Sequence, residues 1–172
     1  MLQAFTLAAA LAAVTALPAL AAQEDPTPGD VAFLGIQFVD TSSEGAYFGE
    51  PSAERARIGL LEEMVRERFV AEGYTLMDLA PIREDLDRIA NPANCYGCDV
   101  RMAQKLGADY VLVGVVQKVS TLIVTMNLVL KDAGDGALLR GQSVDVRENI
   151  DESWLRGMRY ILKNYIFREG GS

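Results

Sequence analysis

The stretch Tyr110-Val-Leu-Val-Gly-Val-Val116 decides the fold. Its apolar residues run without a polar break, which predicts a strand that is covered on both faces. A second run of the same kind extends from Val31 to Phe38. Two strands of this type need helices on both sides of their sheet, so we expect residues 110–116 to form its central strand.

The residues after this strand predict two antiparallel strands and a helix. Apolar and more polar residues alternate from Leu122 to Lys131, the period of a strand with one partly solvated face. Asp132-Ala-Gly-Asp-Gly136 then predicts a hairpin turn, and the next strand covers about 137–148. Asp151 begins an amphipathic helix, whose apolar stripe comprises Trp154, Leu155, Met158, Ile161, Leu162, Tyr165 and Ile166.

The residues before the strand at 110–116 predict a long helix and two short ones. Ser52 can cap a helix that runs to about Glu72, with an inward stripe formed by Ile58, Leu61, Val65 and Phe69. A short strand at 74–79 follows, then a helix from Pro81 to Asn91. Asp99 is expected to cap a last short helix that ends at Leu106.

The resulting order is β-α-β-α-α-β-β-β-α. It predicts an α/β (α+β) fold in which one mixed sheet of about five strands is packed by helices. Residues 31–170 form a single globular domain, and residues 23–30, with two Pro and one Gly, are expected to be a flexible linker.

The first 22 residues predict export. Eighteen of them are apolar and none is charged, and Ala19-Leu-Ala21 matches the A-x-A pattern before a cleavage site. We expect a signal peptide that is cleaved after about Ala21 or Ala22. The mature chain is then periplasmic or secreted and has no integral membrane span.

Composition removes several function classes. The chain has 172 residues, 16 Lys plus Arg against 24 Asp plus Glu, a formal net charge of −8 and no His. The acidic balance argues against nucleic acid and anionic membranes as partners. The absence of His excludes imidazole-based triads, His-ligated zinc and c-type haem attachment, so no metal or cofactor is expected.

Cys95-Tyr-Gly-Cys98 is the sharpest local motif, and three interpretations compete for it. In an exported protein the two cysteines form a structural disulfide that pins a loop. In the second, Cys98 lies at a helix start, which favours a redox-active thiolate, although the charge of Asp99 opposes this. In the third, the thiolates bind metal, but zinc would lack two ligands.

A candidate recognition surface follows from the loops. Residues 39–52 lack periodicity and follow a strand, at the end of a parallel sheet where ligands tend to bind. The short helix before residue 110 is expected to bring the cysteines to the same end. We therefore predict a surface that comprises Tyr47, Phe48, Tyr96 and Asp99 beside the Cys95–Cys98 bridge; core packing of these aromatic residues is the alternative.

Leu-Gly-Ala-Asp-Tyr-Val-Leu-Val-Gly-Val-Val-Gln-Lys-Val, residues 106–119, and the later turn Gly-Asp-Gly-Ala-Leu-Leu resemble a known pattern. Similar segments occur in the N-terminal domain of the TolB family, which is anticodon-binding-like, and in the CsgG and LpoB families. Another similarity is to small secreted bacterial proteins of unknown function with a C-x-x-C segment. The resemblance implies an envelope location and a binding or assembly role without catalysis. It transfers no catalytic residue and no specific partner, since TolB adds a propeller and CsgG and LpoB are lipidated.

The functional expectation is therefore a non-catalytic accessory or assembly module that binds a protein of the bacterial envelope. One alternative is a thiol–disulfide redox or redox-sensing protein that uses Cys95 and Cys98. Another is a small-ligand-binding periplasmic protein, accessory to a periplasmic quinoprotein dehydrogenase system.

Overall fold

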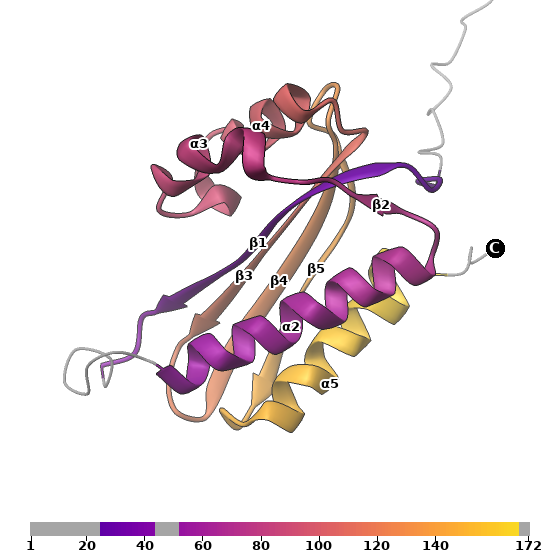
Figure 1. The fold of residues 1–172 in the computed structure, drawn as a ribbon. Coiled ribbons are helices and arrows are strands. Elements are labelled where there is room, and N and C mark those ends of the chain that lie inside the picture. The colour runs from indigo at the N-terminus through magenta and orange to yellow at the C-terminus, as the bar shows by residue number, and fades with distance from the viewer. Residues whose placement is uncertain (1–24, 44–51, 169–172) are drawn as a thin grey trace, which may run out of the picture.

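The structure is a computed structural model, and it describes residues 25–43 and 52–168. The chain forms one five-stranded sheet with helices on both faces (Figure 1). Its elements are β1 (Asp30–Asp40), α2 (Ser52–Ala71), β2 (Thr75–Leu76), η1 (Ala80–Ile82), α3 (Arg83–Asp87), η2 (Pro92–Asn94), α4 (Cys98–Leu106), β3 (Tyr110–Lys118), β4 (Ile123–Asp132), β5 (Leu138–Arg147), α5 (Asp151–Ile161) and η3 (Leu162–Ile166).

The sheet confirms the predicted fold class. Its strand order is β2-β1-β3-β4-β5, with β1 parallel to β2 and β3, and with β4 and β5 antiparallel to their neighbours. Strand β3 is therefore central, as the apolar run at 110–116 predicts. The element order also agrees with the predicted one, because helical and strand periodicities are distinct in this sequence.

Helices α2 and α5 cover one face of the sheet (Figure 1). Their predicted stripes supply the main core, although Ile58, Leu155 and Tyr165 are only partly buried. The largest side chains there are fully buried, and each such burial stabilises the fold by about 1.5–3 kcal/mol. They include Leu61, Val65, Phe69, Trp154, Met158 and Ile161.

Gly35 interrupts the regular pairing of β1. The register with β3 shifts between Phe33 and Ile36, and Gly35 has a φ of +91°. The carboxylate of Glu62 on α2 accepts a hydrogen bond of 2.9 Å from the Ile36 N–H. Phe33 and Ile36 are three positions apart, so strict alternation would place their side chains on opposite faces of the sheet. The bulge keeps both in the core under α2.

The opposite face is covered over only part of its width. Helix α4 and the short turns before it bury a smaller cluster over the start of β1 and β3, which comprises Ala32, Leu34, Ile82, Cys98, Met102, Ala103, Val111 and Ala133. Gln104 anchors α4 by donating to the Ala133 carbonyl at 2.8 Å. The side chains of β4 and β5 that point to this face, such as Thr125 and Ser143, are half-buried or exposed.

The predicted helix 81–91 is shorter than expected. It consists of the turn η1 followed by the five-residue helix α3. Ile82 is fully buried and anchors the segment, while no residue of α3 is buried. A helix this short gains little from propagation, so burial of Ile82 decides its position.

Residues 25–27, part of the linker predicted for 23–30, contact the folded domain. Tyr74 donates a hydrogen bond of 3.0 Å to the Pro26 carbonyl, and Tyr110 donates one of 3.0 Å to the Thr27 carbonyl. The carboxylate of Asp25 pairs with Arg140. The composition of residues 23–30 does not reveal these contacts, because the partners lie far away in the sequence.

Within the described ranges, no helix combines the length and the apolar character that a bilayer crossing requires.

Candidate functional site

A groove lies on the partly covered face, between η2 and the strands β3 to β5. Its volume is about 420 Å³, and its lining comprises Ala93, Val113, Val115, Gln117, Thr125, Asn127, Val129, Lys131 and Ser143. We call it the sheet groove. It exists because α4 and η2 cover one half of this face and leave the other half to solvent.

The sheet groove combines an aliphatic floor with polar groups, which are neutral except for Lys131, whose ammonium is paired with Asp99. Val113, Val115 and Val129 form the floor. Thr125 donates to the Asp145 carboxylate at 2.6 Å, whereas the Asn127 amide has no hydrogen-bond partner among the residues that the structure describes. Such a surface can bind an uncharged segment through apolar contacts and hydrogen bonds to Asn127.

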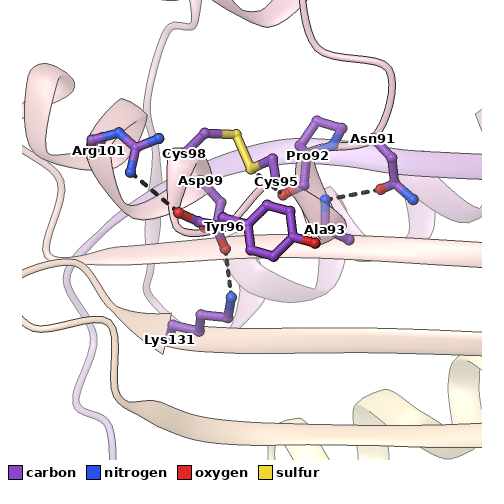
Figure 2. The surroundings of a disulfide bond; sticks show 9 residues. All are labelled: Asn91, Pro92, Ala93, Cys95, Tyr96, Cys98, Asp99, Arg101 and Lys131. Atoms are coloured by element: carbon purple, nitrogen blue, oxygen red, sulfur yellow. Dashed lines mark hydrogen bonds and ion pairs between the residues drawn. A yellow bond between two sulfur atoms is a disulfide. The ribbon is translucent and has the colours of Figure 1, made fainter.

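The disulfide loop lies on the η2 side of this groove (Figure 2). Cys95 and Cys98 are bonded to each other, and their Cα atoms are 5.4 Å apart. The Asn91 side chain accepts a hydrogen bond of 3.0 Å from the Ala93 N–H and so fixes the approach to the loop. The bridge therefore closes a short loop whose entry is also pinned.

Tyr96 is the aromatic residue of the disulfide loop, and it is almost fully exposed. Its side chain is 98% exposed, and Figure 2 shows the ring projecting from the loop. Its φ is +54°, a conformation that costs a non-glycine residue about 1 kcal/mol or more. The Arg101 guanidinium donates to the Tyr96 carbonyl at 3.3 Å. Ring closure and this contact hold an aromatic side chain away from the core.

Asp99 has a different position from the predicted one. It is 1% exposed, so it does not lie on the recognition surface, and Gly97 rather than Asp99 is the N-cap of α4. Its carboxylate accepts a hydrogen bond of 2.6 Å from the Lys131 ammonium on β4 (Figure 2). Asp99 thus fastens the start of α4 to the sheet. No local pattern predicts this pair, because its members lie 32 positions apart.

Tyr47 and Phe48 lie outside the described residues. The structure does describe the strand before their loop. Asp40, the last residue of β1, pairs with Lys118 at the end of β3. Lys131, the partner of Asp99, instead pairs with Val111 near the start of β3. These two positions of β3 are seven residue steps apart, about 23 Å. The expectation that the disulfide loop and the end of β1 meet at one edge is therefore not met. Helix α4 has nine residues and spans only about 13 Å, too little to reach that edge.

A second polar cluster, which the sequence did not single out, lies at that far end. Lys118 is held between Asp40 and Glu54, with N–O distances of 3.5 and 3.4 Å. Asn149 donates to Glu54 at 2.8 Å. Glu54 is only 8% exposed, although it belongs to the first turn of α2. The cluster ties β1, β3, α2 and the segment before α5 together.

The two carboxylates of this cluster titrate below their ordinary range. Burial by itself would raise the pKa of Glu54, but the hydrogen bond from Asn149, a backbone hydrogen bond and the charge of Lys118 outweigh it and lower the pKa. Burial would likewise raise the pKa of Asp40. The hydrogen bonds from Ser42 and the charge of Lys118 outweigh it and lower the pKa. Both groups are therefore ionised in the folded state at neutral pH.

Metal ligation has no basis in the described part of the chain. No three Cys, Asp or Glu side chains there are grouped so that they could hold an ion.

Comparison with known proteins identifies a family and a fold. A family model described as a protein of unknown function, DUF3280 (DUF2380), matches residues 29–166. No curated protein matches the chain.

Solved structures share the fold at low sequence identity. The LpoB C-terminal domain from Salmonella enterica is 15% identical, with 71% of this chain and 84% of that chain covered and a TM-score of 0.50. The LpoB C-terminal domain from Escherichia coli is 16% identical, with 74% and 88% covered and a TM-score of 0.49. Lipoprotein GNA1162 from Neisseria meningitidis is 23% identical, with 77% and 91% covered and a TM-score of 0.45. At these identities the likeness extends to the fold alone. The LpoB part of the predicted resemblance is thus confirmed as a fold, whereas kinship with TolB and CsgG stays a prediction.

Proposed function

The chain belongs to the DUF3280 family of proteins of unknown function, and from this premise we propose that it is a non-catalytic accessory module that binds a protein partner outside the cytoplasm. One observation carries the proposal: a disulfide-closed loop holds Tyr96 almost fully exposed beside a groove on an uncovered sheet face. An exposed aromatic anchor next to an aliphatic and amide surface has the composition of a protein-binding site.

An extracytoplasmic location is supported by two independent features. Eighteen of the first 22 residues are apolar and none is charged, and the segment contains an A-x-A sequence near its end, the pattern of an export signal. The cysteines are joined in a disulfide, a bond that persists in oxidising compartments and is rare in the cytosol. The envelope is where both features are expected together, so the partner is proposed to be an envelope protein.

Site-directed photocrosslinking tests the proposed function. A photoreactive amino acid replaces Tyr96 or Ser143 in the full-length chain, and Glu84, an exposed residue of α3, serves as the matched control. We expect a discrete crosslinked protein from the native envelope at positions 96 and 143 and none at 84. Equal crosslinking at all three positions, or none at any, would overturn the proposal.

A thiol–disulfide function is the main alternative. Cys98 is the first residue of α4, where backbone N–H groups stabilise a thiolate, and Lys131 offsets the negative charge of Asp99. Against it, Cys98 is only 9% exposed, which limits attack by another thiol. A reduction potential well above about −300 mV would favour the redox function, and a lower one the structural role.

Small-ligand binding is a third candidate, because the volume of the sheet groove falls in the range of ligand pockets, about 300–1,000 Å³. Candidate ligands of a quinoprotein dehydrogenase system would then raise the melting temperature of the purified protein. The same rise in a variant with a filled groove, Ser143→Trp, would place binding elsewhere.

A further inference from the structure

Basic side chains line a second groove, on the other side of the molecule, where α2 passes beside the last turns of α5 and η3 (Figure 1). Its volume is about 720 Å³, and we call it the cationic groove. Four of its lining residues are cations and none is an acid. The lining comprises Met64, Arg68, Arg159, Leu162, Lys163, Asn164, Phe167 and Arg168.

This concentration of positive charge contrasts with the rest of the chain. The formal net charge of the protein is −8, yet residues 156–168 contain four basic residues and no acidic one. In a random distribution of 24 acids over 172 residues, a segment of this length would contain about two. The groove is therefore a local positive region on an acidic protein.

Within the described ranges, two of the four cations have a carboxylate partner. Arg68 pairs with Glu72 at 2.5 Å, and Arg159 pairs with Glu152 at 3.3 Å. Among the residues that the structure describes, Lys163 and Arg168 have no carboxylate within 4 Å.

Arg168 also has a like-charged neighbour. Burial first, and then the positive charge of Arg168, lower the pKa of Arg140. Asp25 and Glu72 line a neighbouring cavity together with Arg140 and Arg168, but Asp25 pairs with Arg140 and Glu72 pairs with Arg68. Among the residues that the structure describes, Arg168 therefore has no ion-pair partner of its own and can pair with an external anion.

The backbone presents these side chains through an irregular turn. Residues 162–166 form a π-helical turn, a feature that is frequent at functional sites. Leu162 and Phe167 contribute the apolar floor, together with Met64 from α2. The Arg68 guanidinium lies over the Phe167 ring at 5.4 Å and is thereby fixed at the rim.

The negative ends of the helix dipoles compensate for part of the positive charge of the groove, but not for all of it. Each helix carries about half a negative charge at its C-terminal end. The two helices together therefore balance about one cation. Because two of the four cations remain after the carboxylate pairs are counted, an excess of positive charge persists.

We propose that the cationic groove binds a phosphate-bearing ligand with an apolar portion. Guanidinium groups pair with phosphate in a bidentate geometry, and Lys163 adds a point charge. Met64, Leu162 and Phe167 would contact the apolar portion. The phosphate could belong to a soluble monoester or to a phospholipid headgroup, which share this chemistry. The site is independent of the protein-binding surface proposed above.

Calorimetric titration of the mature chain with hexyl phosphate tests the proposal, with inorganic phosphate as a probe that lacks the apolar portion. The test variant is Lys163→Gln with Arg168→Gln. The matched control is Arg88→Gln with Lys105→Gln, which removes two exposed cations, one directly after α3 and one in α4, and changes the net charge equally.

We expect hexyl phosphate to bind more tightly than inorganic phosphate. Its affinity should fall at least about tenfold in the test variant, the loss that one hydrogen bond to a charged group represents, and stay unchanged in the control. No binding at millimolar hexyl phosphate, or the same loss in both variants, would overturn the proposal. So would a test variant that shows only a lower melting temperature, since the cations would then serve the helix dipoles.

Vesicles of phosphatidylcholine with and without phosphatidylglycerol distinguish the two sources. Cosedimentation that requires phosphatidylglycerol and is lost in the test variant supports a lipid headgroup. Hexyl phosphate binding without cosedimentation supports a soluble monoester.

Discussion

The carboxylate of Asp99 is buried beneath the disulfide loop and is bound by the ammonium of Lys131 at 2.6 Å. Lys131 itself is partly exposed, so the acid bears the larger cost of desolvation. This pair fixes the first turn of α4, and with it the loop that presents Tyr96, to the sheet.

Removing the partner of Asp99 should destabilise the fold. We expect Lys131→Ala to lower the free energy of unfolding by about 2–4 kcal/mol, because a buried carboxylate is left without its cation. Urea denaturation measures the change. Lys105→Ala, which breaks the exposed pair with Asp85, should cost less than about 1 kcal/mol. Similar losses in the two variants would contradict the structural role of the Asp99–Lys131 pair.

Opening the disulfide should act locally. A ring of four residues constrains little chain, and the entropy model gives it about 2 kcal/mol. We expect Cys95→Ser with Cys98→Ser to lose no more than this, while hydrogen exchange at the amides of residues 95–98 becomes much faster. Faster exchange that extends to the core strand β3 would mean that the bridge supports the whole domain.

The Lys118 cluster should make the free energy of unfolding depend on pH in the acidic range. Because the pKa of Glu54 is lower in the folded state than its ordinary value of 4.5, its contribution is fully present above that value. It is lost as the pH falls through the folded-state pKa. Asp40, whose ordinary value is 3.8, behaves in the same way.

Urea denaturation of wild type and Glu54→Gln at a series of pH values checks this dependence. We expect the stability difference between the two proteins to be constant above about pH 5.5 and to shrink below pH 4.5. A difference that grows on acidification would show that the pKa of Glu54 is raised, not lowered.

Two glycines offer a matched pair of substitutions. Gly35→Ala should cost about 2 kcal/mol or more, because φ is +91° and the new Cβ would lie 2.8 Å from the Glu62 carboxylate. Gly59→Ala, in α2 with no atom within 4 Å of a new Cβ, should instead stabilise the protein by about 0.5–1 kcal/mol. Thermal unfolding measures both. Equal effects would remove the case for a required bulge at Gly35.

Periodicity in the sequence predicts the layout of this fold well. The unbroken apolar runs, the alternation from Leu122 onward and the helical stripe through Leu61, Val65 and Phe69 are local signals, and each strand and helix they predict is present. The bulge at Gly35 escaped the prediction, since it depends on a hydrogen bond to Glu62 on another element.

The candidate site was less predictable. The cysteine pairing and the exposure of Tyr96 agree with the sequence, because a C-x-x-C loop admits few arrangements. The burial of Asp99 and the half-covered sheet face depend on contacts between distant elements, which one sequence does not reveal. Tyr47 and Phe48 stay predictions.

Asp25 and Arg168, the first and last residues that the structure describes, both lie close to Arg140. The two ends of the described polypeptide are therefore near each other. For such a domain, the point at which the chain is cut matters less than the contacts it makes. A permuted gene that joins these two positions by a short linker and opens the hairpin at Gly134 should encode the same architecture, with Tyr96 and the cationic groove retained on their separate faces.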